Sequence, residues 1–178
     1  MGFAVASGGA IFNDVHVNGV DAKGRVSLPA AFRQTIEIRC ANGEVATGLE
    51  KTLKMARHRE LPCIEVYDAR QVSEVEQSML RRAQKEADET GEFVDDIYER
   101  MEYAAFPSRK DVTFDSAGRM VLPQRLRDKL KIGDDAVFVG GGRTFRIWSP
   151  EVLRAEGGEG PETIEDMEDA LARRGARG

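Results

Sequence analysis

Hydrophobic and polar residues alternate in two short segments of the chain, which predicts two β-strands that each bury one face. Val15 and Val17 alternate with more polar neighbours in the first half, and Val112 and Phe114 do the same in the second. Successive side chains of a strand point to opposite faces, so a period of two is typical of a strand covered on one side. We therefore expect one such strand in each half of the chain.

The segment after each predicted strand has the same pattern in both halves. Residues 21–34 read DAKGRVSLPAAFRQ, and residues 115–128 read DSAGRMVLPQRLRD. They align without a gap and share Asp, Gly, Arg, Leu, Pro and a second Arg at the same places. Glycine suits a tight turn because it takes positive φ without steric cost, and proline suits the first turn of a helix. Each segment predicts a turn, a short strand and a helix, and the repetition indicates a duplicated unit.

The two predicted helices, 30–36 and 124–130, each carry an apolar pair four residues apart, which places both members on one face. The pairs are Phe32 with Ile36 and Leu126 with Leu130. After the second helix, residues 132–148 predict a strand, a glycine hairpin and another strand. In the first half the corresponding region holds a longer, more polar insertion, and its end, CIEVYDARQV, takes the place of FRIWSPEVL.

Helical periodicity fills the connection between the halves and the end of the chain. Three segments have apolar residues at spacings of three and four. They are Val72, Val75, Met79 and Ala83, then Phe93, Ile97 and Met101, and finally Ile164, Met167 and Leu171. Gly91 and Pro107 are expected to end the first two helices.

Composition and charge change this picture in one respect. The 178 residues fit one domain or two small fused ones, and 26 Lys and Arg against 31 Asp and Glu give a net charge of -5. A negative sum argues at first against a nucleic-acid partner. The acids gather in the tail, however, where residues 151–169 contain eight acids and a single base, Arg154. The repeated segments themselves are basic.

Several classes of protein are not expected. Two cysteines and two histidines lie apart from one another, so the sequence predicts neither a disulfide framework nor a metal site. No segment has 18 consecutive apolar residues, and the first residues lack a basic region before an apolar one, so we expect no membrane span and no signal peptide. No catalytic constellation is visible, so neither an enzyme nor a cofactor is expected, and the chain is expected to be cytoplasmic.

The repeated D-x-x-G-R pattern has a structural interpretation. The aspartate accepts backbone N–H groups in a turn, the glycine makes the turn, and the arginine pairs with the aspartate. In two copies, the pattern also resembles the MraZ family, which consists of two SpoVT-AbrB-type repeats, each marked by D-x-x-x-R. Asp21 with Arg25 and Asp115 with Arg119 match this motif, and the resemblance covers about residues 15–153.

The resemblance implies an α+β, β-rich fold, a double swapped-hairpin barrel made from two pseudo-symmetric repeats with helices between them. The repeats would span 11–67 and 109–153, joined by a helical connection at 68–106 and followed by an acidic tail at 154–178 with a linker and a short helix. It also implies a homo-oligomeric ring of eight or more subunits.

The same resemblance implies a function. Members of the family are bacterial transcription regulators that bind G-rich direct repeats of double-stranded DNA in the promoter of the cell-division and cell-wall gene cluster, to which their own gene belongs. We therefore expect a nucleoid-associated DNA-binding protein. By similarity, the residues that contact DNA are Arg25 above all, with Lys23 and Arg119.

The chemistry of these side chains fits that assignment. The planar fork of arginine matches O6 and N7 of guanine in the major groove. Asp21 cannot accept a hydrogen bond from those atoms, because both are acceptors. Lys23 and Arg33 are better suited to phosphate contacts, which position a protein without reading sequence. Arg119 has an alternative role as a structural or interface residue. The residues expected to shape the turns are Asp21, Gly24, Asp115 and Gly118.

Three other functions are less consistent with the sequence. A ring-forming scaffold of the same fold could use the acidic tail for docking and bind no specific DNA. An antitoxin-like regulator of the same superfamily would be expected to carry one repeat rather than two. An enzyme is the weakest alternative.

Overall fold

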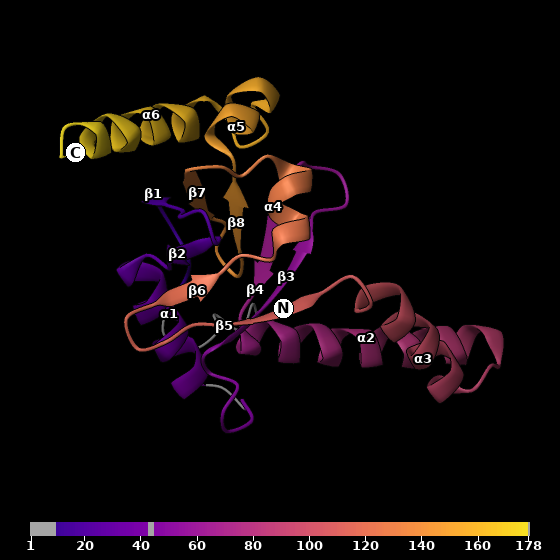
Figure 1. Ribbon diagram of the computed structural model, residues 1–178. Helices are drawn as coiled ribbons and strands as arrows, with labels where there is room; N and C mark the ends of the chain where they lie inside the picture. Colours follow the sequence, from indigo (N-terminus) through magenta and orange to yellow (C-terminus); the bar gives the residue numbers. More distant parts are fainter. Residues whose placement is uncertain (1–9, 43–44, 178) are drawn as a thin grey trace.

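The computed structural model describes residues 10–42 and 45–177, and this part of the chain forms a mixed α+β fold (Figure 1). The segment 1–9, on which the expectation about a signal peptide depends, lies outside the described residues. The elements, in chain order, are β1 (Val15–Gly19), β2 (Arg25–Ser27), α1 (Ala30–Ala41), β3 (Thr52–Arg57), β4 (Ile64–Tyr67), α2 (Ala69–Thr90), α3 (Val94–Ala105), β5 (Lys110–Thr113), β6 (Arg119–Val121), α4 (Gln124–Leu130), β7 (Asp135–Gly140), β8 (Phe145–Trp148), α5 (Pro150–Glu156) and α6 (Pro161–Gly175).

The strands form one sheet of six and one of two, and both sheets combine strands from the two halves of the chain. The large sheet has the order β1-β7-β8-β4-β3-β5, and the small sheet pairs β2 with β6. All of these pairings are antiparallel. First-half strands β1, β4 and β3 thus pair with second-half strands β7, β8 and β5. The two halves are interleaved through their backbone hydrogen bonds.

The sheets differ from the barrel that the sequence predicts. In the described residues β1 and β5 are the edges of the large sheet, and β2 and β6 pair only with each other. β2 and β6 have three residues each, and neither joins an edge of the large sheet. The arrangement is an open six-stranded sheet with a separate two-stranded ribbon, not a closed barrel.

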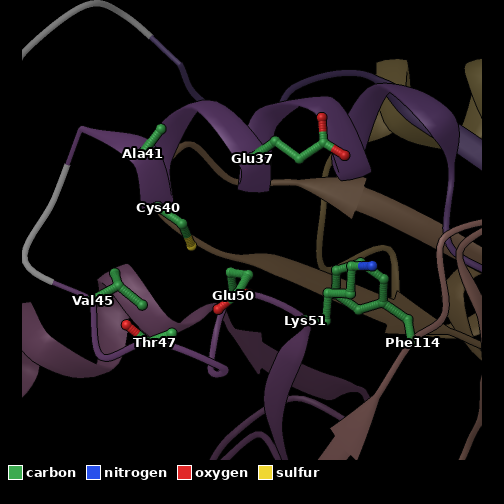
Figure 2. A pocket seen from close by; sticks show the side chains of 8 residues that line it. All are labelled: Glu37, Cys40, Ala41, Val45, Thr47, Glu50, Lys51 and Phe114. Atoms are coloured by element: carbon green, nitrogen blue, oxygen red, sulfur yellow. The ribbon is translucent and has the colours of Figure 1, made fainter.

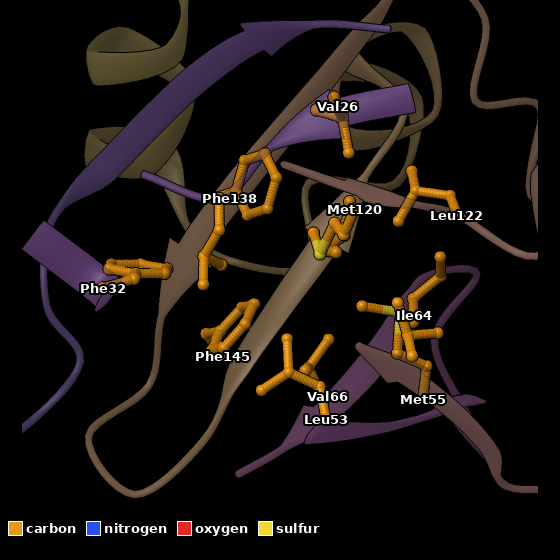
Figure 3. Packing of buried hydrophobic residues seen from close by; sticks show 14 of the residues in the cluster. Val26, Phe32, Leu53, Met55, Ile64, Val66, Met120, Leu122, Phe138 and Phe145 are labelled. Carbon is orange, nitrogen blue, oxygen red and sulfur yellow. The ribbon is translucent and has the colours of Figure 1, made fainter. Parts of the chain in front are cut away.

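The main core lies between the ribbon, the large sheet and helices α1 and α4 (Figure 3). Four phenylalanines form its centre, and the rings of Phe32 and Phe145 lie with their centroids 4.9 Å apart. Val26 and Met120 point into the core from the ribbon, and each is 3% exposed. The apolar pairs predicted for the two helices are buried as expected. Burying one such side chain contributes roughly 1.5–3 kcal/mol.

Strand β3 is an element that the sequence interpretation missed. Residues 52–57 fall in the segment taken as a polar insertion, yet Leu53 and Met55 are fully buried and alternate with half-buried residues. The alternation was present in the sequence but is surrounded by lysine, arginine and histidine. Helix α1 also runs five residues beyond the predicted end, to Ala41.

Helices α5 and α6 cover the face of the large sheet that looks away from the main core. Met167 is fully buried there with Trp148 and Leu153. Glu159 fixes the linker between the helices, because its Oε1 accepts from Trp148 Nε1 at 3.0 Å and from Arg146 Nη1 at 2.8 Å. The predicted helix of the tail is thus present, and it packs against the body of the protein.

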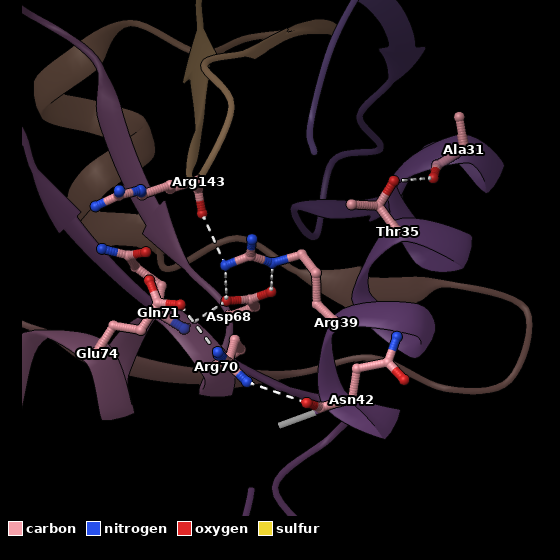
Figure 4. A network of polar contacts seen from close by, with 9 residues as sticks. All are labelled: Ala31, Thr35, Arg39, Asn42, Asp68, Arg70, Gln71, Glu74 and Arg143. Carbon is pink, nitrogen blue, oxygen red and sulfur yellow. Dashed lines mark hydrogen bonds and ion pairs between the residues drawn. The ribbon is translucent and has the colours of Figure 1, made fainter. Parts of the chain in front are cut away.

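Helices α2 and α3 form a hairpin that extends from the body (Figure 1). α2 begins after Asp68, which is completely buried and accepts from Gln71 N at 2.8 Å. Asp68 also pairs with Arg39 Nε at 2.6 Å, and Arg39 donates to the carbonyl oxygen of Arg143 (Figure 4). This network joins α1, the β7–β8 hairpin and the base of the helical arm that α2 and α3 form. Phe93, predicted as part of an apolar stripe, is instead 80% exposed at the start of α3.

Among the described residues, no helix combines the length and the apolar character that a membrane span requires.

Candidate nucleic-acid interface

The first repeated motif forms a tight turn between β1 and β2. Asp21 N donates to Arg25 O at 3.0 Å, and Gly24 N donates to Asp21 O at 2.9 Å. The Asp21 carboxylate also accepts from Lys23 N and Arg25 N, both at 2.9 Å. Arg25 Nε donates to Asp21 Oδ2 at 2.5 Å. The aspartate therefore shapes the turn and holds the arginine stem, as predicted from the residue types.

The second motif repeats this geometry between β5 and β6. The Asp115 carboxylate accepts from Ala117 N at 3.0 Å, from Arg119 N at 2.9 Å and from Arg119 Nε at 2.7 Å. In both turns these contacts hold the pKa of the aspartate below its ordinary value of 3.8, first through the arginine backbone N–H and next through the arginine side chain. Each turn thus presents an ionised carboxylate bound to an outward-facing arginine.

Pairing of β2 with β6 brings the two arginines onto one surface. Arg25 lies opposite Val121, and Ser27 lies opposite Arg119. All four residues are exposed, while the residues between them, in the middle of each strand, are buried. The Arg25 side chain is 63% exposed and that of Arg119 is 74% exposed. As diagonal neighbours on one face of an antiparallel ribbon, the two arginines stand roughly 7–8 Å apart, with their Cβ atoms somewhat closer.

Each motif glycine lies beneath an arginine from the other half of the chain. Gly24 and Gly118 have φ values of 81° and 80°, which a side chain rarely adopts. A Cβ at Gly24 would stand 2.5 Å from Arg127 Nε, and one at Gly118 would stand 2.6 Å from Arg33 Cδ. Glycine is therefore required at both positions for two reasons: the positive φ of the turn and the close approach of the arginine.

Backbone contacts join the two turns in the same crossed manner. Leu28 N donates to Gly118 O at 2.8 Å, and Leu122 N donates to Gly24 O at 2.9 Å. Each turn is thereby bound to the strand end of the other half. This crossing fixes the position of one motif relative to the other.

The structure places the predicted site residues in two groups. Lys23, Arg25 and Arg119 are exposed on the turns and the ribbon. Arg33 is half-buried instead, and its Nη1 donates to Ser116 O at 2.9 Å, so it braces the second turn. The sequence interpretation did not identify Arg127, which braces the first turn. The sequence does contain a sign of this role, because Arg127 aligns with Arg33 in the repeat.

A separate cavity of about 390 Å³ lies between the end of α1 and the segment before β3 (Figure 2). Its lining includes Glu37, Cys40, Glu50 and Lys51. Burial raises the pKa of the Cys40 thiol to about 11, so the thiol is protonated at neutral pH and is a poor nucleophile. The cavity therefore does not present an activated nucleophile.

Comparison with known proteins adds an independent line of argument. A family model described as "MraZ protein, putative antitoxin-like" matches residues 105–153, which contain the second motif. The "Transcriptional regulator MraZ" of Gluconacetobacter diazotrophicus is 32% identical over 150 residues, 83% of this chain and 85% of that protein. The protein of the same name from Ruegeria pomeroyi is 35% identical over 138 residues, 77% of this chain and 76% of its own length. That of Rhodospirillum rubrum is 32% identical over 155 residues, 84% and 86% of the two chains.

These relatives are named as regulators, which agrees with the prediction that the chain is not an enzyme. Each of these matches covers more than three quarters of this chain. The chain belongs to the MraZ family of transcriptional regulators.

Proposed function

We propose that this chain regulates transcription by binding double-stranded DNA with the β2–β6 ribbon, and that Arg25 and Arg119 read guanines in the major groove. The observation that carries the proposal is the presence of both motif arginines on one exposed face of a two-stranded ribbon. The major groove of B-DNA admits such a ribbon, and arginine is the side chain that most often contacts guanine there.

The salt bridges within the turns support this role. Asp21 and Asp115 bind the Nε atoms of their arginines, which leaves the two terminal amino groups of each guanidinium for a bidentate contact with O6 and N7. The stem of each arginine is held before DNA arrives. Such preorganisation lowers the entropic cost of binding.

The proposed target is a set of G-rich direct repeats upstream of the protein's own gene, in the division and cell-wall gene cluster. The proposed assembly is a homo-oligomeric ring in the cytoplasm, associated with the nucleoid, in which each subunit has the double swapped-hairpin arrangement with repeats at 11–67 and 109–153. Several ribbons on one ring would bind several repeats together, which raises affinity without a strong single contact. The ring would also bring the basic ribbons of several subunits together, although each chain has a net negative charge.

Fluorescence anisotropy with a duplex from that upstream region tests the proposal. Wild type should prefer this duplex to a scrambled one, and Arg25→Ala should lose about 1–3 kcal/mol of that preference, the contribution of one bidentate base contact. Arg81→Ala is the control, because Arg81 is also exposed but lies on α2. Equal binding of both duplexes by the wild type would contradict the proposal.

A salt series separates base contacts from phosphate contacts. Lys23→Ala should reduce the salt slope by about 1 and leave sequence preference intact.

Arg33 is proposed as a phosphate contact on the same chemical ground, although it also braces the second turn. Arg33→Gln will lower the salt slope if Arg33 binds phosphate, and only the thermal stability if it is a brace.

The second candidate function is a ring-forming interaction scaffold. The observation that favours it is the exposed acidic surface of α6, which carries Glu162, Glu165, Asp166 and Asp169. Strong oligomerisation without salt-sensitive DNA binding would select the scaffold over the regulator.

A further inference from the structure

The exposed face of the β2–β6 ribbon contains one apolar residue, Val121, which is 53% exposed. It stands directly opposite Arg25 in the ladder, so their Cβ atoms are about 4.5–5.5 Å apart. A single exposed valine on a protein surface is common and needs no explanation by itself. Val121, however, stands beside one motif arginine and two residues along the strand from the other.

The first copy of the repeat has a serine, Ser27, at the position that Val121 occupies in the second copy. The ribbon has a local two-fold axis at the Val26–Met120 pair, which relates Arg25 to Arg119 and Ser27 to Val121. Ser27 is exposed, extended and paired like Val121. This strand position therefore accepts a small polar side chain, and the fold does not require an apolar one there.

We propose that Val121 is a specificity-determining residue that contacts the 5-methyl group of a thymine next to the guanine read by Arg25. This inference rests on the proposed function. In the major groove, thymine is the base that presents a methyl group, and apolar side chains recognise it by direct contact. A ribbon placed so that Arg25 reaches a base edge brings the residue opposite Arg25 to the neighbouring base pair.

The difference between Val121 and its symmetry-related residue, Ser27, also gives the ribbon a direction. The two arginines alone are related by the two-fold axis, so they would bind a site equally well in either orientation. Direct repeats require every subunit to bind in the same orientation. Val121 against Ser27 breaks the symmetry on the ribbon face, and Lys23 against Ala117 breaks it at the turn tips.

Deoxyuridine substitution provides the test, because it removes only the 5-methyl group of thymine. The duplex from upstream of the gene is prepared with each thymine in turn replaced by deoxyuridine, and binding of the full chain is measured by anisotropy. For the wild type, replacing the thymine at one position in each repeat should weaken binding by about fourfold, the ratio expected for one buried methyl group. Val121→Ala should bind the thymine and deoxyuridine duplexes equally.

Two further variants keep the result interpretable. Val121→Thr retains the branched shape and one methyl group, so it should fold and preserve part of the sensitivity. Leu80→Ala removes an exposed apolar side chain from α2 and should keep the full wild-type sensitivity. Trp148, the only tryptophan, is fully buried, and its fluorescence reports whether each variant is folded.

The outcomes distinguish this inference from the proposed function. A wild type that prefers its duplex to a scrambled one but is indifferent to deoxyuridine at every position overturns the role of Val121 alone. A wild type without any sequence preference overturns both. A Val121→Ala variant that changes its oligomeric state while keeping the deoxyuridine sensitivity assigns Val121 to a contact between subunits and also overturns the inference.

Discussion

Arg33, from the first half of the chain, lies across Gly118 of the second motif, and its Nη1 donates to the carbonyl oxygen of Ser116 at 2.9 Å. Arg127 lies across Gly24 of the first motif, and its Nε donates to the carbonyl oxygen of Leu122 at 3.3 Å. The two motifs are therefore held by each other's halves. Under the proposed function, this crossing helps to hold Arg25 and Arg119 at a fixed spacing, because each turn is bound to the other half of the chain.

The first prediction concerns the glycine under Arg33. Gly118→Ala should destabilise the protein more than Gly91→Ala, because both positions have positive φ but only Gly118 has neighbours close to the added methyl group. The excess should be about 1–3 kcal/mol, the usual cost of overpacking. Urea unfolding followed by Trp148 fluorescence at one protein concentration measures it. Equal losses in the two variants would mean that Arg33 moves aside freely.

The second prediction concerns the carboxylate of the second turn. Because its pKa is depressed in the folded state, Asp115 contributes stability that is present above the unfolded pKa and is lost as pH falls through the folded value. Arg119→Met should raise the pKa of Asp115 toward 3.8 but not fully restore it, since the backbone donors remain. Carboxyl-detected NMR titration measures this. Asp21 in the same variant is the control and should titrate as in the wild type.

The third prediction concerns the buried pair at the base of the helical arm. Asp68→Asn keeps a good N-cap for α2 but leaves the guanidinium of Arg39 without its counter-charge, and the Arg39 side chain is only 9% exposed. We expect a loss of about 3–5 kcal/mol in the free energy of unfolding. Arg100→Ala breaks an exposed pair with Glu92 and should cost less than about 1 kcal/mol. Similar losses in both variants would contradict the structural role of the buried pair.

Much of the fold was predictable because local signals agreed with tertiary structure. The helix 124–130 has the predicted bounds, and the glycine hairpin before Phe145 joins the two predicted strands. Strand β3 was missed because its apolar residues, Leu53 and Met55, alternate with lysine and threonine whose stems lie at the sheet surface. Its pairing with β4 is a hairpin closed by residues 58–63, whereas its pairing with β5 joins distant parts of the chain, and no local pattern encodes such a contact.

The site divides in the same way. The Asp21–Arg25 contact is local, so residue types and spacing predicted it. The ribbon that unites Arg25 with Arg119 depends on a pairing across more than half of the chain, and the bracing by Arg127 depends on the crossing of the halves. Neither can be derived from periodicity. The alignment of the repeat held a clue, since it placed Arg127 at the same position as Arg33.

The last prediction concerns the acidic surface of α6. We expect it to limit non-specific DNA binding, because like charges repel phosphate. Deleting the tail would not test this cleanly, because Glu159 accepts a hydrogen bond from Trp148 and Met167 is buried against Trp148 and Leu153. Replacing the exposed Glu165, Asp166 and Asp169 by their amides removes charge and keeps the packing.

This triple variant should bind a scrambled duplex more tightly, on the order of a few-fold at low salt, and the difference should fade as salt screens the charges. The preference for the upstream duplex over the scrambled one should fall correspondingly, since specific contacts are unchanged while competing binding rises. Arg154 and Glu168 remain paired in this variant, so the α5–α6 contact is preserved. Unchanged binding of the scrambled duplex at every salt concentration would leave the acidic surface without an effect on DNA and would favour a protein partner for it.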